Sequence, residues 1–236
     1  MPNKIAWCDK TWNPIVVSAD GWTGELCFVP NKLDEPLKWR KPQRIFVCSM
    51  GDLFHDKVKL EWLCEIARSI NQSPQHTYLI TTKRAERMQD QMRIHYSQYC
   101  VRPIPNLHLG ISVSIQKDLD DNIQYLLDTP AAVRWISLEP MLGPIDNIFR
   151  EKVFKTVGKG VSGRTHYAPR KIDWVVCGCE SGPGRRPMKE EWALDVAQQC
   201  SVAGVPFFMK QMEIDGRVTG EMSKFPPGLQ RREYPR

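Results

Sequence analysis

One pattern constrains the fold of this chain more than any other: from residue 44 onward, short strand-like apolar runs alternate with segments of helical period. The runs span residues 44–49, 77–82, 107–113, 133–138, 174–178 and 205–210. Because they are almost continuously apolar, they suit parallel strands that are covered on both faces. Helices are predicted over residues 58–70, with Asp56 as a possible cap, and over 85–99, 118–127 and 189–203, the last ending at Gly204. Repeated βα units of this kind predict an α/β fold.

The position of the polar residues favours a barrel over an open sheet. In a barrel, every strand delivers its carboxyl end to one mouth, whereas a doubly wound sheet collects functional residues at a single switch point. Here polar side chains follow all six predicted strands. We therefore predict a partial or complete (βα) barrel of parallel strands, forming a single domain over residues 1–236. Residues 1–43, rich in Trp and Pro, and the irregular stretch 141–172 are expected to be additions to it.

Charge and hydropathy exclude some classes of protein. The net charge of +6 permits a nucleic-acid or phosphorylated partner without demanding one, because the sequence has no dense block of Lys and Arg. No apolar run approaches the ~18 residues that span a bilayer, and the first ten residues have no signal-like stretch. We therefore expect a cytoplasmic protein without a membrane partner.

The eight cysteines are scattered and include no C-x-x-C pair, which is typical of buried thiols. Cys177 and Cys179 would point to opposite faces of one strand, so that this pair alone cannot chelate a metal.

Three carboxylates follow predicted strands: Asp52, Glu139 and Glu180. Acids that converge can bind an ammonium group, a ribose diol or a metal, or they can act as acid and base. The alternative is that each acid caps the helix after it. Lys83 and Arg84 are candidates for an anion clamp, although a solvated pair in the first turn of a helix would have the same sequence.

The glycine-rich turn at residues 178–184 precedes Arg185 and Arg186 and resembles a phosphate-binding turn. It matches neither the Walker A nor the dinucleotide fingerprint, so the signal is weak. His55 is a candidate base or ligand, but a histidine at this place can equally make a local hydrogen bond.

Longer strings resemble one family. They are KTWNPI (10–15), GWTGE (21–25), LDEPLKWRKP (33–42), IFVCSMGDLFH (45–55), TTKR (81–84), SLEPMLGPI (137–145), VCGCESGPGRRP (176–187) and AGVPFFMKQ (203–211). The chain resembles, nearly from end to end, the phage- and prophage-encoded three-cysteine-motif family of unknown function. Members look like divergent radical S-adenosylmethionine (SAM) proteins. The resemblance implies a partial (βα) barrel in which three cysteines after the first strand hold a [4Fe–4S] cluster.

The chain departs from this family where the cluster would be bound. Members continue after the equivalent of Ile15 with a loop that contains the three cysteines, whereas here five residues lead directly to Gly21. Either the chain has lost the loop, or the printed sequence omits residues between Ile15 and Gly21. If no residues are omitted, Ile15 and Gly21 can lie at most ~20–22 Å apart, which is the length of a fully extended chain between them.

The resemblance also implies roles for residues at the strand ends. It assigns Ser49, Met50 and Asp52 to the methionine amino group of SAM, Ser112 and Ser114 to its ribose or carboxylate, and Gly178, Glu180 and Ser181 to its adenine. Lys83, Glu139 and Lys210 would then face the substrate as catalytic residues.

We therefore expect a radical-SAM-like phage protein that binds SAM or a nucleotide at the barrel mouth and acts on a nucleotide or nucleic acid. The alternative is an inactive barrel that binds a nucleotide, a nucleic acid or a phage-encoded protein partner. In a third possibility, the Trp-rich start of the chain and two arginine pairs, at 185–186 and 231–232, bind nucleic acid.

Overall fold

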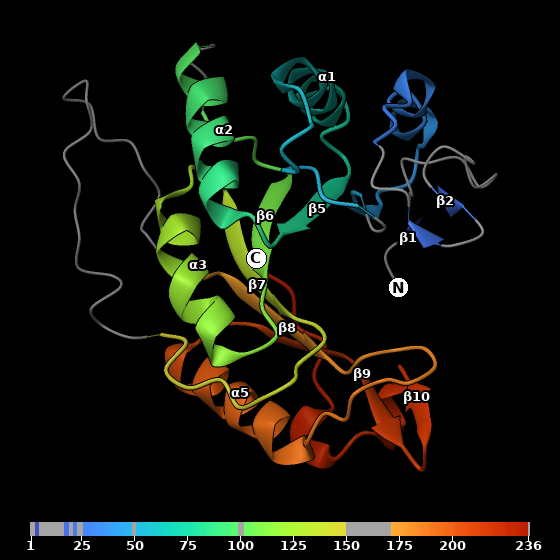
Figure 1. Ribbon diagram of the computed structural model, residues 1–236, viewed down its shortest axis with the longest axis vertical. Coiled ribbons are helices and arrows are strands. Elements are labelled where there is room, and N and C mark those ends of the chain that lie inside the picture. Colours follow the sequence, from blue (N-terminus) through green and yellow to red (C-terminus); the bar gives the residue numbers. More distant parts are fainter. Residues whose placement is uncertain are drawn as a thin grey trace.

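A computed structural model describes residues 3–4, 17–18, 21–22, 26–48, 51–98, 102–149 and 171–235. Its main element is an eight-stranded sheet (Figure 1). In their order across the sheet, the strands are β1 (Asn3–Lys4), β4 (Arg44–Phe46), β5 (Thr77–Thr82), β6 (Leu107–Ser112), β7 (Val133–Leu138), β8 (Trp174–Gly178), β9 (Phe207–Ile214) and β10 (Arg217–Thr219). A separate antiparallel pair is formed by β2 (Val17–Ser18) and β3 (Gly21–Trp22).

The strand order confirms the partial barrel. From β1 to β9 all neighbours are parallel, and their order in space follows their order in the chain. A doubly wound sheet would reverse that order at its switch point, and the described strands show no reversal. The sheet curls into a half-barrel. Among the described strands, no pairing joins β1 to β9 or β10, so these strands do not close a complete barrel.

In the described ranges, four α-helices pack on the outer face of the sheet: α1 (Leu60–Asn71), α2 (Ala85–Gln98), α3 (Gln116–Asp128) and α5 (Glu190–Ala203). Their positions agree with the predicted helices to within about two residues. The predicted cap of α1 is wrong: the helix begins at Leu60 after Lys59, so Asp56 lies too far upstream. The predicted end of α5 is confirmed, because Gly204 adopts a left-handed conformation with φ of 65°. Short 3-10 helices complete the fold: η1 (Pro30–Lys32), η2 (Pro36–Lys38), η3 (Met222–Lys224) and η4 (Pro227–Leu229).

The last strand pair was not predicted. Strand β9 extends four residues beyond the predicted run and turns back into β10 through Asp215 and Gly216. Both turn residues have positive φ, 50° and 74°. Type I′ hairpin turns require this conformation, and Asp-Gly is one of the preferred sequences for it. The dipeptide was the signal that could have revealed the hairpin.

The two faces of the sheet have separate cores because side chains alternate along a strand. On the outer face, residues such as Ile80, Leu109 and Ile136 belong to the large core beneath the helices. On the inner face, Leu79 and Trp135 begin a smaller and more aromatic core. The functional question therefore concerns what the inner face carries at the carboxyl ends of the strands.

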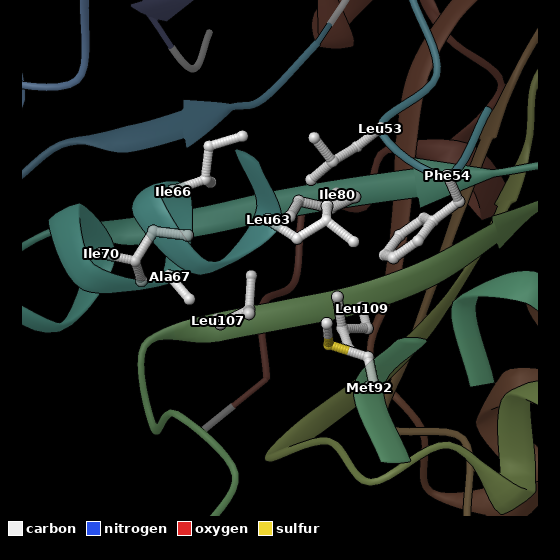
Figure 2. A pocket seen from close by; sticks show the side chains of 10 residues that line it. All are labelled: Leu53, Phe54, Leu63, Ile66, Ala67, Ile70, Ile80, Met92, Leu107 and Leu109. Atoms are coloured by element: carbon white, nitrogen blue, oxygen red, sulfur yellow. The ribbon is translucent and has the colours of Figure 1, made fainter. Parts of the chain in front are cut away.

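A small gap lies between α1, α2 and the outer face of β5 and β6 (Figure 2). All ten lining side chains are apolar: Leu53, Phe54, Leu63, Ile66, Ala67, Ile70, Ile80, Met92, Leu107 and Leu109. A site for a nucleotide or SAM needs polar groups that fix the ligand, and this lining has none. The gap therefore reflects packing, with Phe54 from the loop after β4 at one end.

Several expectations concern residues outside the described ranges. Trp7, Trp12, Ile15 and residues 150–170 are among them, and so the choice between a lost loop and omitted residues falls on an undescribed position. Trp39 is described and packs edge-on against His76, with ring centroids 5.9 Å apart. This contact agrees with a packing role for that tryptophan. No helix in the described part of the chain has the length and apolar character needed to cross a membrane.

Candidate functional site

Five polar side chains lie on the inner face where the strands end. Ser112 of β6 and Ser137 of β7 are register partners, so both point to one face. Trp135 belongs to the inner core and precedes Ser137 by two residues, so that face is the inner one. The same alternation places Thr81 beyond Leu79 and Glu139 beyond Ser137 on the inner face. Lys210 is the extra residue at a register irregularity between β8 and β9, and it joins this face through its contact with Glu139. We call the set the inner rim: Thr81, Ser112, Ser137, Glu139 and Lys210.

Glu139 and Lys210 form an ion pair across strand β8. The Lys210 ammonium donates to both carboxylate oxygens of Glu139, at 2.5 and 2.7 Å. The two residues flank β8, and strands two positions apart are separated by about 10 Å. Gly178 lies between them, and a Cβ there would be 3.5 Å from Glu139 Cδ. The glycine therefore leaves the space in which the two side chains meet.

The pair is open enough to exchange partners. The Lys210 and Glu139 side chains are 44% and 20% exposed. An exposed ion pair contributes only about 0–1 kcal/mol, so a ligand that satisfies both charges can replace it at little cost. Lysine is suited to a carboxylate or phosphate and glutamate to an ammonium group. A matched acid and base therefore suit a ligand that carries both charges.

One hydroxyl group of the rim is an unsatisfied polar atom. Thr81 Oγ1 is buried and has no hydrogen-bond partner among the described residues. Ser137 is 6% exposed, and its register partner Ser112 is half-buried. Leaving a buried polar atom unpaired costs about 1–3 kcal/mol. A ligand hydroxyl that reached this row would remove that cost at Thr81.

An aromatic floor lies below the rim on the same face, formed by Phe46, Trp135, Trp174, Phe208 and Tyr234. Phe46 meets Trp135 edge-on at 6.2 Å between ring centroids, and Phe208 meets Trp174 in the same way at 6.0 Å. Both phenylalanines are only half-buried. Gly110 makes room for the floor, because a Cβ there would lie 2.7 Å from the indole of Trp135.

The C-terminal tail closes the amino end of this face. Glu233 pairs with β9 through a bond from its N–H to the carbonyl of Phe207, at 3.0 Å. Its own carbonyl accepts from Trp174 Nε1 at 2.9 Å. The next residue, Tyr234, lies under the guanidinium of Arg44, 3.7 Å from its ring centroid. The tail thus links the first residue of β4 to β9, at the end of the sheet opposite the rim.

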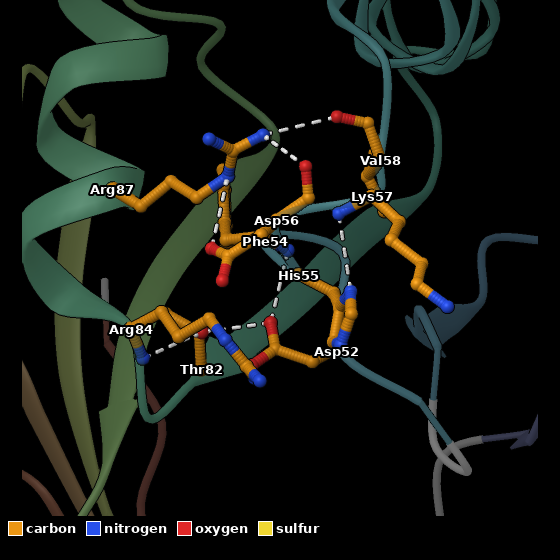
Figure 3. A network of polar contacts seen from close by, with 9 residues as sticks. All are labelled: Asp52, Phe54, His55, Asp56, Lys57, Val58, Thr82, Arg84 and Arg87. Atoms are coloured by element: carbon orange, nitrogen blue, oxygen red, sulfur yellow. Dashed lines mark hydrogen bonds and ion pairs between the residues drawn. The ribbon is translucent and has the colours of Figure 1, made fainter. Parts of the chain in front are cut away.

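Asp52 is fully occupied by contacts within the protein (Figure 3). One carboxylate oxygen accepts hydrogen bonds from Thr82 Oγ1 at 2.7 Å and from the N–H of Phe54 at 2.9 Å. The other forms an ion pair with Arg84 at 2.7 Å. Thr82 faces outward, since it alternates with Thr81. In this structure Asp52 therefore fixes the loop that carries Phe54 on the helix-covered side.

The remaining predicted residues near Asp52 contribute little to a site. His55 accepts a local hydrogen bond from the N–H of Lys57 on Nδ1, at 3.2 Å. Lys83 is exposed and makes no ion pair with the described residues. Ser49 and Met50 lie outside the described ranges. Their predicted contact with a methionine amino group stays a prediction.

The turn after β8 is held together by its own ion pairs. Arg186 binds Glu180 through its guanidinium at 2.6 Å and its backbone N–H at 2.7 Å. These hydrogen bonds lower the pKa of Glu180 to about 2. Arg185 is similarly paired with Glu213 at 2.6 Å, while Ser181 is exposed. The arginines are engaged by carboxylates rather than available to a phosphate.

Ser114 supports the backbone at the start of α3. Its N–H donates to the carboxylate of Asp118 at 2.8 Å, and its carbonyl accepts from the N–H of Leu142 at 2.8 Å. These bonds connect the loops after β6 and β7. Each predicted acid is therefore paired with a candidate cation: Glu139 with Lys210 on the inner face, Asp52 with Arg84 of the predicted anion clamp, and Glu180 with Arg186 of its own turn.

Three of the six described cysteines are buried thiols that do not suit an iron–sulfur cluster. Cys177, Cys179 and Cys200 are buried, and burial raises the pKa of the Cys200 thiol to about 12 and that of Cys177 still further. Ligation of iron requires accessible thiolates. In the part of the chain that the structure describes, no group of three or more His, Cys, Asp or Glu is arranged to hold a metal ion.

The aromatic floor was not identified from the sequence. Trp135, Trp174 and Phe208 lie in apolar runs that predicted buried strands, and nothing in a single run shows which face each residue joins. The signal was available only after alignment of the runs. With the parallel register fixed, Trp135 and Trp174 become neighbours, with ring centroids 5.4 Å apart.

Comparison with known proteins identifies a family without a known activity. No curated protein and no solved structure matches this chain. The family model described as "Protein of unknown function (DUF5131)" matches residues 16–224, which is most of the chain. The chain therefore belongs to this family, DUF5131.

Proposed function

We propose that this protein binds S-adenosylmethionine on the inner face of the half-barrel, at the inner rim. The observation that carries the proposal is the Glu139–Lys210 pair above Gly178. The amino-acid end of SAM has one ammonium and one carboxylate group, which match one acid and one base. A nucleoside triphosphate has only negative charge at that end, and Glu139 would repel it.

The rest of the inner face supports an adenosine group. The hydroxyls of Thr81 and Ser112 suit the ribose diol, and Thr81 Oγ1 is buried without a described partner. The half-buried ring of Phe208 lies two residues before Lys210 on the same strand, so about 7 Å separates the two along β9. Stacking of a base on an aromatic side chain contributes about 1–3 kcal/mol.

A closer relationship to radical SAM proteins, a phage origin and a cytoplasmic location remain part of this proposal. The partial barrel and the resemblance of the sequence support the first. Because no group of three or more possible metal ligands is found among the described residues, we assign no reductive step to this chain. The proposed activity is binding, with a nucleotide or nucleic acid as the proposed second partner.

Titration calorimetry with SAM, S-adenosylhomocysteine and ATP tests the identity of the ligand. We expect SAM to bind and Glu139→Gln to weaken it by about 10-fold or more, because a charge-assisted hydrogen bond contributes about 1.5–3 kcal/mol. The same substitution should not weaken the binding of ATP. Matched control variants are Glu221→Gln and Lys224→Gln, which open another lysine–glutamate pair, 2.7 Å apart and away from the rim.

Two results would overturn the proposal. ATP that binds more tightly than SAM, and more tightly still after Glu139→Gln, would identify an anionic nucleotide as the ligand. No heat and no shift in melting temperature with any of the three ligands at millimolar concentration would remove the site.

A further inference from the structure

A short cationic segment lies at the opposite end of the sheet from the rim. Residues 38–44, which we call the basic strip, read KWRKPQR and contain four cations and no acid. They connect the end of η2 to strand β4. Because the excess of positive charge over the whole chain is small, a local group of cations without acids stands out. Lys38, Arg40 and Lys41 are all exposed.

His76 braces the backbone of the basic strip. Its Nδ1 accepts a hydrogen bond from the N–H of Gln43 at 3.1 Å, so this nitrogen carries no proton. Its Nε2 lies 2.9 Å from the carbonyl of Pro36 and donates to it. One buried neutral imidazole thus holds the chain on both sides of the strip. The residue is 1% exposed.

Further contacts fix the middle of the strip. Gln75 Nε2 donates to the carbonyl of Trp39 at 3.2 Å, and the carbonyl of Gln43 accepts from the N–H of Thr77 at 2.8 Å. Trp39 turns its ring toward His76 and the large core. The cations therefore project from a backbone whose conformation is set before any partner binds, which reduces the entropy lost on binding.

The strip cations differ from the arginines considered from the sequence. Arg185, Arg186 and Arg231 are each bound to a glutamate at 2.6–3.0 Å. Lys38, Arg40 and Lys41 form no ion pair with any described residue. Glu35, the acid just before them, is already paired with Lys32 at 2.6 Å. An external anion therefore meets no competing acid from the described residues at these three side chains.

We propose that the basic strip docks the phosphate backbone of a nucleic acid. An extended chain spans at most ~20–22 Å from residue 38 to 44. One DNA strand places a phosphate about every 3.4 Å along the helix axis, so the strip can follow several successive phosphates. Several exposed cations on a fixed backbone suit such a polymer. An anionic membrane is less suitable, because Trp39 packs inward and leaves the strip without an exposed aromatic anchor.

The test is the salt dependence of binding to a 20-base-pair fluorescent duplex, measured by anisotropy. The variant carries Lys38→Gln, Arg40→Gln and Lys41→Gln together. Three lost phosphate contacts should lower the slope of log K against log salt by about 2.7. The affinity ratio of wild type to variant should then shrink about 40-fold between 50 and 200 mM salt. The matched control, Arg68→Gln with Lys117→Gln and Lys224→Gln, removes the same charge from cations that are paired with acids.

Each outcome decides the proposal. A large loss of slope in the strip variant and a small one in the control support it. Equal losses would mean that only net charge attracts the duplex, and unchanged binding would place the contact elsewhere. Binding to phosphatidylserine vesicles without binding to the duplex would point to a membrane. Because the proposal does not depend on the SAM site, Glu139→Gln should leave duplex binding unchanged, and the strip variant should still bind SAM.

Discussion

Glu139 and Lys210 are 71 residues apart in the chain and meet over the glycine that ends β8. The contact depends on the parallel pairing of β8 with β7 and β9, which places the carboxyl end of β7 and the middle of β9 on either side of Gly178. It brings one acid and one base to a partly exposed position above an aromatic surface. This relationship is the basis of the proposed ligand site.

Gly178→Val should disrupt this arrangement. A Cβ at Gly178 would already lie 3.4 Å from Gln211 and 3.5 Å from Glu139, so the two extra methyl groups of valine must displace the carboxylate. Valine is otherwise a favourable strand residue, so the fold should persist. We expect the affinity for SAM to fall about 10-fold or more, with Gly178→Ala weakening it less, as measured by calorimetry. Equal affinities of the Gly178→Val and Gly178→Ala variants for SAM would show that the ligand does not use the space above Gly178.

Asp52 substitutions should act on stability. Asp52→Ala leaves Thr82 Oγ1 and the N–H of Phe54 without their acceptor, and each unpaired group costs about 1–3 kcal/mol. Asp52→Asn keeps an acceptor oxygen and loses only the charge opposite Arg84, so we expect a smaller loss. Urea unfolding gives both values. An alanine variant within about 0.5 kcal/mol of the wild type would show that this carboxylate does not anchor the loop.

His108 should make the protein less stable in mild acid. It lies on the inner face opposite Leu79, and its Nδ1 is buried without a described partner. Burial lowers the pKa of His108 from its ordinary value of 6.5 to about 4, with Asp173 opposing the shift and Arg44 adding to it. Between about pH 6.5 and pH 4, this histidine is protonated in the unfolded chain but not in the folded protein. The free energy of unfolding therefore falls as the pH is lowered through that window, and this histidine causes no further loss below it.

The size of this effect is on the order of 3 kcal/mol, from 1.36 kcal/mol for each unit of pKa shift. Urea unfolding between pH 7 and pH 4 measures it, and His108→Gln should remove this part of the pH dependence. An unchanged pH profile in the variant would assign the acid sensitivity to other groups.

Tyr234 should hold the amino end of the half-barrel together. Its ring lies 5.7 Å from Trp174 and 5.3 Å from Phe208 between centroids, under the guanidinium of Arg44. Aromatic pairs contribute about 0.5–1.5 kcal/mol and a cation–π contact about 0.5–1. Tyr234→Ala should therefore lower the free energy of unfolding by about 1–3 kcal/mol. Tyr234→Phe keeps the ring and should lose little, so equal losses would contradict this assignment.

The order of strands and helices was predictable because each element is encoded locally. Continuous apolar runs such as residues 77–82 indicate strands buried on both faces, and a helical period such as that of α5 indicates a helix on the sheet. The end of β9 was not predictable from the same signal. Beyond Lys210 the strand is no longer continuously apolar, because the buried Met212 is followed by the exposed Glu213, and its limit is set by the Asp215–Gly216 turn.

The site was only partly predictable because its contacts join distant residues. The predicted polar strand ends included Glu139 and Lys210, but nothing in either segment shows that they meet. Asp52 looks equivalent to Glu139 in sequence, yet its partner Thr82 lies on the outer face. A shift of one residue along a strand reverses the face, so similar motifs reach opposite sides of the sheet.

The central claim is tested most directly by the affinity of SAM for the wild type, Glu139→Gln and Lys210→Gln, each measured by calorimetry at the same ionic strength. The account predicts one site per chain and a loss of about 10-fold or more in each variant, since each removes one of two charge-assisted contacts. Variants that bind SAM within twofold of the wild type would contradict it.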